Sequence, residues 1–160
     1  PVRAVTAIGG ESDEGKHRYW QSGRRLSPEA LAAGRRFLAM AYALIYMLPG
    51  VPSIYYGDEI CMQGYKDPFN RAYFDWNYTG PDLRTVLRRL ASQRRGCRAM
   101  KEGALRILRA EGGILHIERR SGKSVAEACF NRTNSPLYTT LLGKHVEIAP
   151  NGFAVQTTAR

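Results

Sequence analysis

Charged and aromatic residues gather in one stretch of this 160-residue chain, Leu48 to Trp76, which reads LPGVPSIYYGDEICMQGYKDPFNRAYFDW. Its second half carries Asp67 and, four residues later, Arg71. Around this pair stand five aromatic residues: Tyr65, Phe69, Tyr73, Phe74 and Trp76. An acid and a base on the loop that leaves the C-terminal end of a strand form the arrangement in which barrel enzymes hold their sites. The simpler alternative, compatible with the first, is an i,i+4 ion pair that only pins the loop.

A second acidic pair, Asp58 and Glu59, follows directly on the strand that we predict below. Neighbouring side chains near a strand end point to opposite sides, so these two carboxylates cannot flank one bond. We therefore predict a structural role for them, in which they receive hydrogen bonds or a salt bridge. The three histidines have neither metal-binding nor triad spacing, and we expect no metal site and no cofactor.

The elements that position this stretch follow from local signals. Ser27-Pro28-Glu29 should start a helix, because serine caps free amides, proline suits the first turn and glutamate complements the helix dipole. This helix should run to about Leu48, where Pro49-Gly50 ends it. We predict a strand at Ser53 to Gly57 and a second helix from Gly80 to about Met100, an order typical of a parallel α/β layout. Loops are expected at residues 1–8 and 11–26.

After residue 102 the pattern changes to short alternating runs separated by turn residues. Runs of strand length at this spacing indicate an antiparallel sheet or sandwich, and we place a domain boundary near residue 102. The six predicted strands are Ala104–Ala110, Ile114–Arg120, Ser124–Asn131, Leu137–Leu142, His145–Ile148 and Phe153–Thr158.

The segment GVPSIYYGDE, followed by MQGYKDPFNRAYFDW, resembles the region around the eighth barrel strand of the α-amylase family (glycoside hydrolase family 13). Within that family it is most similar to the neopullulanase and cyclomaltodextrinase group. The resemblance implies that residues 1–101 are an α/β piece of a (β/α)8 barrel, with the seventh helix and the eighth strand and helix. Residues 102–160 would form an all-β antiparallel C-terminal sandwich domain. The opening PVRAVTAIGG would follow the family's serine-histidine-aspartate motif, and it lacks an initiator methionine, as expected for a fragment of a longer chain.

The same resemblance implies a function. It indicates a parent enzyme that hydrolyses α-glucosidic bonds with retention in α-glucans or cyclodextrins, and in which Asp67 and Arg71 bind substrate on the donor side of the cleft. Retaining hydrolysis needs two carboxyl groups about 5 Å apart, and the family's catalytic acids follow barrel strands that this sequence does not contain. We therefore expect no catalytic residue here and an inactive isolated chain. The alternative is a stand-alone, non-catalytic carbohydrate-binding or structural β module.

Composition bears on the partners of the chain. A net charge of +10 raises nucleic acid as a partner, but Arg94-Arg95 and Arg119-Arg120 are pairs and not tracts, so we expect no nucleic-acid binding. The longest apolar run, Phe37 to Pro52, is interrupted by Pro49 and Gly50, and we expect no membrane span.

Cysteine usage and the unpaired elements give two further expectations. Three cysteines without C-x-x-C spacing favour free thiols in a reducing compartment, and hence a cytoplasmic protein. Unpaired strand edges and uncovered helix faces favour association. We therefore predict a homo-oligomer with contacts mainly from residues 28 to 76.

Overall fold

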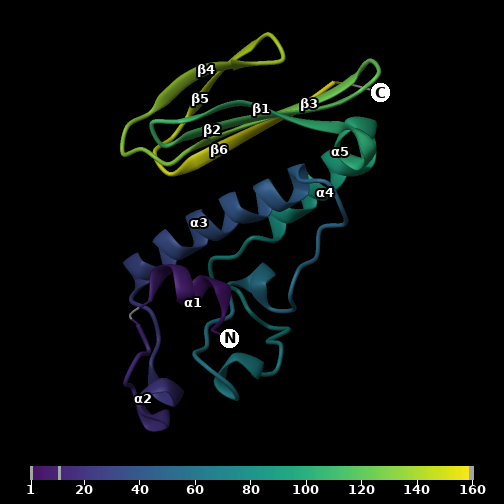
Figure 1. Ribbon diagram of the computed structural model, residues 1–160. Helices are drawn as coiled ribbons and strands as arrows, with labels where there is room; N and C mark the ends of the chain where they lie inside the picture. The colour runs from purple at the N-terminus through teal and green to yellow at the C-terminus, as the bar shows by residue number, and fades with distance from the viewer. Residues whose placement is uncertain (1, 11, 159–160) are drawn as a thin grey trace. The chain divides into compact units, whose positions relative to one another are not determined.

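The computed structural model describes residues 2–10 and 12–158 (Figure 1). The chain divides into two compact units, which we call the first unit (Pro1–Ala39 with Ser53–Leu87) and the strand unit (Met40–Pro52 with Arg88–Arg160). The division runs through the helices α3 (Pro28–Met47) and α4 (Arg84–Gly96), so each unit takes a part of both. The predicted boundary near residue 102 marks the point where the strands begin; as a domain boundary it stays a prediction.

Short helices lie between irregular segments in the first unit. They are α1 (Ala4–Gly9), α2 (Arg18–Gly23), the first part of α3, and the single 3-10 turns η1 (Asp58–Ile60) and η2 (Phe69–Arg71). Glycine allows α1 and α3 to touch: a Cβ on Gly9 would lie 2.5 Å from the carbonyl oxygen of Ala30, and one on Gly34 would lie 2.9 Å from that of Val5. Val5 is buried at this contact, which fixes α1 against the long helix.

Helix α3 begins and ends as predicted. The Oγ of Ser27 accepts a hydrogen bond from the amide of Ala30 at 3.2 Å, which is the capping interaction expected from its sequence. Hydrogen bonds from its own backbone amide, and then from Ser27, lower the pKa of Glu29 in the first turn. The helix ends at Met47, two residues before Pro49-Gly50.

Three local predictions for the first unit are wrong. Residues 51–55 have no regular secondary structure and residues 56–57 form a turn, so the segment Ser53–Gly57 is not a strand. A strand needs a neighbouring strand to receive its hydrogen bonds, and the described residues of this unit supply none. The two predicted loops contain α1 and α2; α2 starts where Nδ1 of His17 accepts the amide of Trp20 at 3.3 Å. The (β/α)8 arrangement therefore stays a prediction.

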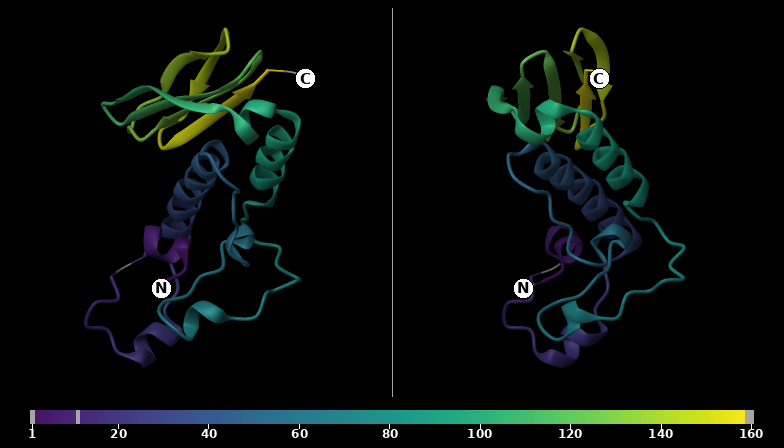
Figure 2. Two further views of the ribbon diagram at one scale, coloured as in Figure 1. Left: turned by 45° about the vertical axis from the view of Figure 1, so that its right-hand side comes forward. Right: turned by 90° about the vertical axis from the view of Figure 1, so that its right-hand side faces the viewer.

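The strand unit contains two antiparallel sheets, and its strands match the predicted runs to within about one residue (Figures 1 and 2). A four-stranded sheet has the order β1-β2-β3-β6, and a hairpin of β4 and β5 forms the second sheet. The bounds are β1 (Ala104–Glu111), β2 (Ile114–Ser121), β3 (Ser124–Asn131), β4 (Leu137–Leu141), β5 (Lys144–Ile148) and β6 (Gly152–Thr157).

The core of the strand unit lies between the two sheets, with the hairpin over one face of the four-stranded sheet (Figure 2). Four buried side chains from both sheets form it: Ile114, Cys129, Leu141 and Ile148. Because side chains alternate along a strand, the other face of β2 and β3 carries a second buried set, which includes Ile117 and Ala128. Both faces of the central strands therefore carry buried side chains.

Two arginines bind the carbonyl end of α3 within the strand unit. Arg119 on β2 donates from Nη1 to the carbonyl of Met47 at 2.7 Å and from Nε to that of Gly103 at 2.8 Å. Arg94 on α4 donates to the carbonyl of Tyr46 at 2.8 Å. Helix ends leave carbonyl groups without partners inside the helix, so these guanidinium groups act as C-terminal caps from distant parts of the chain.

The second predicted helix is interrupted. Helix α4 ends at Gly96, Cys97 has extended backbone, and a separate helix α5 (Arg98–Glu102) leads into the first strand. The Sγ of Cys97 lies 3.5 Å from the Oγ of Ser124, whose oxygen also accepts the amide of Ala99 at 3.1 Å. The break therefore places the start of α5 against β3.

No helix among the described residues combines the length and the apolar character needed to cross a membrane.

Candidate functional site

Asp67 and Arg71 form the ion pair expected from their spacing. The 3-10 turn η2 brings Arg71 back toward the aspartate, and its Nε lies 2.7 Å from Oδ1 of Asp67. The peptide bond between Asp67 and Pro68 is cis. Both side chains are more than half exposed, at 57% for Asp67 and 67% for Arg71. A guanidinium has five N–H donors in a planar fork and a carboxylate has two acceptor oxygens, so the pair can bind a hydroxyl-rich ligand without separating.

The aromatic residues near the pair differ in burial, and Phe69 and Phe74 are half-buried. Tyr65 is buried, and its ring packs edge-on against Trp20 with centroids 4.9 Å apart, so it belongs to the core. Trp76 is 85% exposed and its ring lies 4.7 Å from that of Phe74. Tyr73 is fully exposed. Trp76 and Tyr73 are therefore the rings that can offer a flat apolar face to a ligand, and Tyr65 is not.

Asp58 has the structural role predicted for it. Its Oδ1 lies 3.7 Å from Nη1 of Arg3, and both side chains are buried. At Glu59 it is the backbone carbonyl that accepts the amide of Leu83, at 2.8 Å, and the role predicted for the carboxylate of Glu59 stays a prediction.

Arg3 is the residue at this site that sequence reasoning missed. Its side chain lines a cavity of about 350 Å³ with Tyr55, Asp58 and Asn70, and it contacts the loop that carries Asp67 and Arg71. A single arginine in the sequence PVRAV gives no periodic or motif signal. Only the fold brings it to residues more than fifty positions away along the chain.

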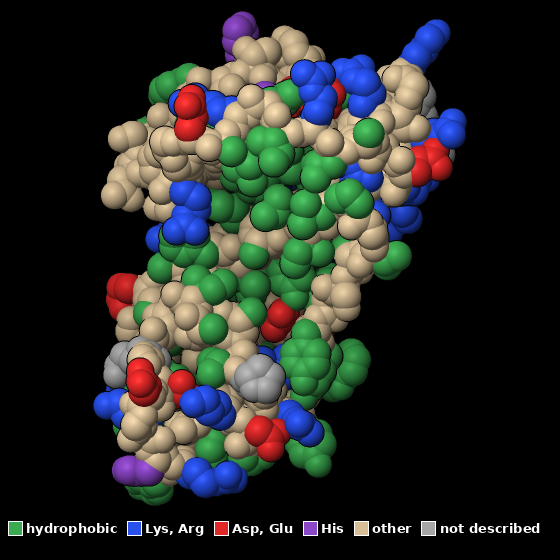
Figure 3. Space-filling model, viewed as in Figure 1, with side chains coloured by type: hydrophobic (Ala, Val, Ile, Leu, Met, Phe, Trp, Pro, Cys, Tyr) green, Lys and Arg blue, Asp and Glu red, His purple; other side chains and the backbone are tan. Residues whose placement is uncertain are grey.

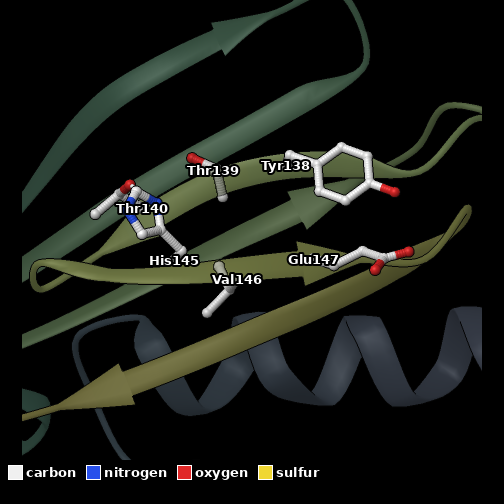
Figure 4. A pocket seen from close by; sticks show the side chains of 6 residues that line it. All are labelled: Tyr138, Thr139, Thr140, His145, Val146 and Glu147. Carbon is white, nitrogen blue, oxygen red and sulfur yellow. Dashed lines mark hydrogen bonds between the residues drawn. The ribbon is translucent and has the colours of Figure 1, made fainter.

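A second hollow, of about 450 Å³, lies on the β4–β5 hairpin (Figure 4). Tyr138 stands opposite Glu147 at one end, and at the other the Oγ1 of Thr140 lies 3.3 Å from Nδ1 of His145. Thr139 and Val146 complete the lining. The Tyr138 residue is 73% exposed. The hollow thus combines an open aromatic ring with hydrogen-bonding groups on one short sheet.

Neither the distribution of charged side chains nor the cysteines indicate a further candidate site in the part of the chain that the structure describes. Lysine and arginine form separate groups on the face drawn in Figure 3, with acidic side chains among them. No cluster of histidine, cysteine and acidic residues that could hold a metal ion occurs among the described residues. The three cysteines are free and buried, and desolvation raises the pKa of Cys61 to about 11, which keeps that thiol protonated.

Comparison with known proteins identifies relatives of the chain. No protein-family model matches it. An amylopullulanase from Thermoanaerobacter thermohydrosulfuricus is 40% identical over 90 residues, which are 56% of this chain and 6% of that protein. A cyclomaltodextrin glucanotransferase from Paenibacillus macerans is 36% identical over 110 residues, which are 69% of this chain and 15% of that protein.

Solved structures point the same way. The cyclic α-maltosyl-(1→6)-maltose hydrolase from Arthrobacter globiformis matches with a TM-score of 0.71 at 26% identity, over 82% of this chain and 32% of that one. A maltogenic amylase from S. marinus matches with a TM-score of 0.67 at 28% identity, over 76% of this chain and 19% of that one. The chain belongs to the α-amylase family.

Membership of the α-amylase family confirms the resemblance drawn from the segment around Asp67. The chain spans 15% or less of the length of the two curated relatives named above. Within the family the sugar-binding role of Asp67 and Arg71 stays a prediction.

Proposed function

We propose that this chain is the C-terminal portion of a retaining glycosidase of the α-amylase, neopullulanase or cyclomaltodextrinase type, which hydrolyses α-glucosidic bonds in α-glucans or cyclodextrins. The names of the relatives, amylopullulanase and cyclomaltodextrin glucanotransferase, support this substrate class. Residues 1–101 would belong to the catalytic barrel and residues 102–160 to the C-terminal β domain. The exposed pair of Asp67 and Arg71 is the observation that carries the proposal.

The geometry of the pair fits a binding role better than a purely structural one. An exposed i,i+4 ion pair contributes about 0.3–0.5 kcal/mol to stability, which is little for a loop of this length. In contrast, the outward-facing guanidinium and carboxylate can donate to and accept from sugar hydroxyls at once. The role of the pair is thus to hold a glucose unit on the donor side, while the carboxylates that cleave the bond lie in the rest of the enzyme. The isolated chain is accordingly inactive on starch, cyclodextrin and pullulan.

The test is Arg71→Ala in the full-length enzyme. A hydrogen bond to a charged group is worth about 1.5–3 kcal/mol, so kcat/KM on a long maltooligosaccharide should fall roughly 10- to 100-fold. The melting temperature should change by no more than about 2 °C, because the lost ion pair is exposed. Substrates too short to reach the donor-side loop should be hydrolysed at the wild-type rate.

Arg98→Ala is the matched control. Arg98 also forms an i,i+4 ion pair, with Glu102, and its side chain is 72% exposed, but it lies in the strand unit. It should show the same small loss of stability and unchanged kinetics on every substrate. An Arg71→Ala enzyme with unchanged kcat/KM and a lowered melting temperature would refute the binding role and show that the pair only stabilises the loop.

A stand-alone, non-catalytic carbohydrate-binding module is the second candidate, and the hollow on the β4–β5 hairpin favours it (Figure 4). In that case the isolated chain should be retarded by immobilised amylose, and Tyr138→Ala should remove the retardation. Tyr19→Ala is the control, because Tyr19 is a tyrosine in the first unit that is at least as exposed as Tyr138. Retardation that survives Tyr138→Ala would count against the hairpin as the binding surface.

A further inference from the structure

Arg3 holds the two ends of the loop that carries Asp67 and Arg71. Its Nε donates to the carbonyl of Asn70 at 2.7 Å, and its Nη1 donates to the carbonyl of Tyr56. The guanidinium is 1% exposed. We define the loop as residues 56–71. The side chain of Arg3 therefore links Tyr56, at the start of this loop, with Asn70, the residue next to Arg71.

Other contacts of the same guanidinium restrict its position further. The rings of Tyr55 and Tyr56 each have their centroid 4.5 Å from the Cζ of Arg3, within the range of a cation–π interaction. The carboxylate of Asp58 balances the charge at 3.7 Å. A buried guanidinium with this many partners has one orientation, and the carbonyl of Asn70 is fixed with it.

Helix α1 adds a third anchor in the middle of the loop. The backbone amide of Arg3 donates to the carbonyl of Gly64 at 2.9 Å, and the amide of Gly64 donates to Oγ1 of Thr6 at 3.0 Å. Position 64 requires glycine, because a Cβ there would lie 2.2 Å from the carbonyl oxygen of Phe69. The loop is thus bound at its start, its middle and its end by α1 and its N-cap residue Arg3.

We propose that Arg3 is a positioning residue for sugar binding, which acts through the carbonyls of Tyr56 and Asn70 to hold Asp67 and Arg71 in their binding geometry. The inference rests on the proposed function of the pair. Arginine suits the role because its rigid fork reaches two carbonyls at once, which a lysine ammonium on a flexible stem does not. Arg3 itself touches no substrate.

A simple structural role would predict a loss of stability alone, and Arg119 provides the comparison. It too is buried and donates to two backbone carbonyls, at 2.8 and 2.7 Å, but in the strand unit. Arg3→Lys and Arg119→Lys should therefore both lower the melting temperature of the full-length enzyme. Only Arg3→Lys should lower kcat/KM on a long maltooligosaccharide, by about ten-fold, with short substrates unaffected.

Combined variants test whether Arg3 acts through the pair. If it does, adding Arg3→Lys to an enzyme that already carries Asp67→Ala and Arg71→Ala should leave kcat/KM unchanged, to within about two-fold. A further ten-fold loss in that enzyme would overturn the inference while leaving the role of Arg71 intact. No effect of Arg71→Ala would overturn both.

Hydrogen exchange of the 160-residue chain gives a readout that does not depend on activity. The amide of Arg71 donates to the carbonyl of Pro68 at 3.0 Å and that of Phe69 to the carbonyl of Lys66 at 2.9 Å. Both should exchange roughly ten-fold faster in Arg3→Lys and at the wild-type rate in Arg119→Lys. Unchanged exchange in Arg3→Lys would refute the anchoring.

Thr6→Val is the milder second variant, should Arg3→Lys fail to fold. It keeps the shape of the side chain and removes only the acceptor of the Gly64 amide. Because it releases the middle of the loop and not its end, it should produce faster exchange and weaker sugar use in the same direction with a smaller amplitude. Wild-type exchange and kinetics in this variant would contradict the view that α1 positions the loop.

Discussion

Arg119 offers a direct measure of what a buried arginine contributes to the strand unit. Its guanidinium on β2 donates to the carbonyls of Met47 and Gly103, one from the end of α3 and one from the start of the strands. The perturbation is Arg119→Met, which keeps an unbranched side chain of similar length and removes the donors. The stem of the side chain can still pack, so the loss reports on the polar contacts.

The expected magnitude follows from the two acceptors. Each buried carbonyl left without a donor costs about 1–3 kcal/mol. The buried charge of Arg119 has the opposite effect, because its two hydrogen-bond acceptors are neutral carbonyls. Desolvation, and then the nearby charge of Arg94, lower the pKa of Arg119. Removing such a charge returns part of the cost, as replacements of buried ions by apolar residues show. We expect a net loss of about 3 kcal/mol, or a fall in melting temperature of about 6–12 °C.

The assay is urea unfolding followed by far-ultraviolet circular dichroism. Tryptophan fluorescence is unsuitable, because Trp20 and Trp76 both lie in the first unit. Arg98→Met is the control for the loss of an exposed arginine, with an expected change below about 0.5 kcal/mol. If Arg119→Met differs from Arg98→Met by less than about 1 kcal/mol, the two carbonyls are satisfied by water, and the view that Arg119 caps α3 is wrong.

Three further predictions concern single properties of the chain. Asn131→Asp should lower the free energy of unfolding by about 3 kcal/mol, because the fully buried Nδ2 of Asn131 donates to three backbone carbonyls that a carboxylate would repel. Urea unfolding measures this loss, and a near-neutral change would contradict the prediction. Burial raises the pKa of Cys61 to about 11 from 9.0, so the folded chain keeps a proton that the unfolded chain releases. Stability should therefore fall between pH 9 and 11, by up to about 1.4 kcal/mol per pH unit more than in Cys61→Ala; parallel pH profiles would refute this. Residues 28–76 should mediate self-association, so a monodisperse monomer in light scattering would exclude the predicted homo-oligomer.

The elements that the sequence predicted well are those set by neighbouring residues. Ser27 caps α3 because serine, proline and glutamate each act within one turn. The strands were found because alternation and turn residues are local too. The turn at Leu142-Gly143, for example, has φ angles of 49° and 76° at its two central residues, the backbone of a tight hairpin connection. Glycine at the second position was the visible signal, and leucine at the first was not.

The errors lie where structure depends on distant partners. The segment Ser53–Gly57 has β-branched and aromatic residues, but strand formation also needs a neighbouring strand, which composition cannot supply. Cys61 shows a similar limit. Its φ of 53° lies in the left-handed region of backbone conformation, which favours glycine. The residue type alone carried no trace of that conformation.

Arg3 and Arg119 explain why the site could be predicted only in part. Asp67 and Arg71 interact through their side chains at i,i+4 spacing, so their residue types and positions predict the contact. Arg3 and Arg119 instead donate to backbone carbonyls, and every residue has one, so no partner type marks the acceptor. Arg3 and Asn70 stand 67 positions apart, and nothing in either local sequence links them. A sequence can therefore predict the side chains that contact a ligand, whereas the residues that position those side chains can be identified only from the folded backbone.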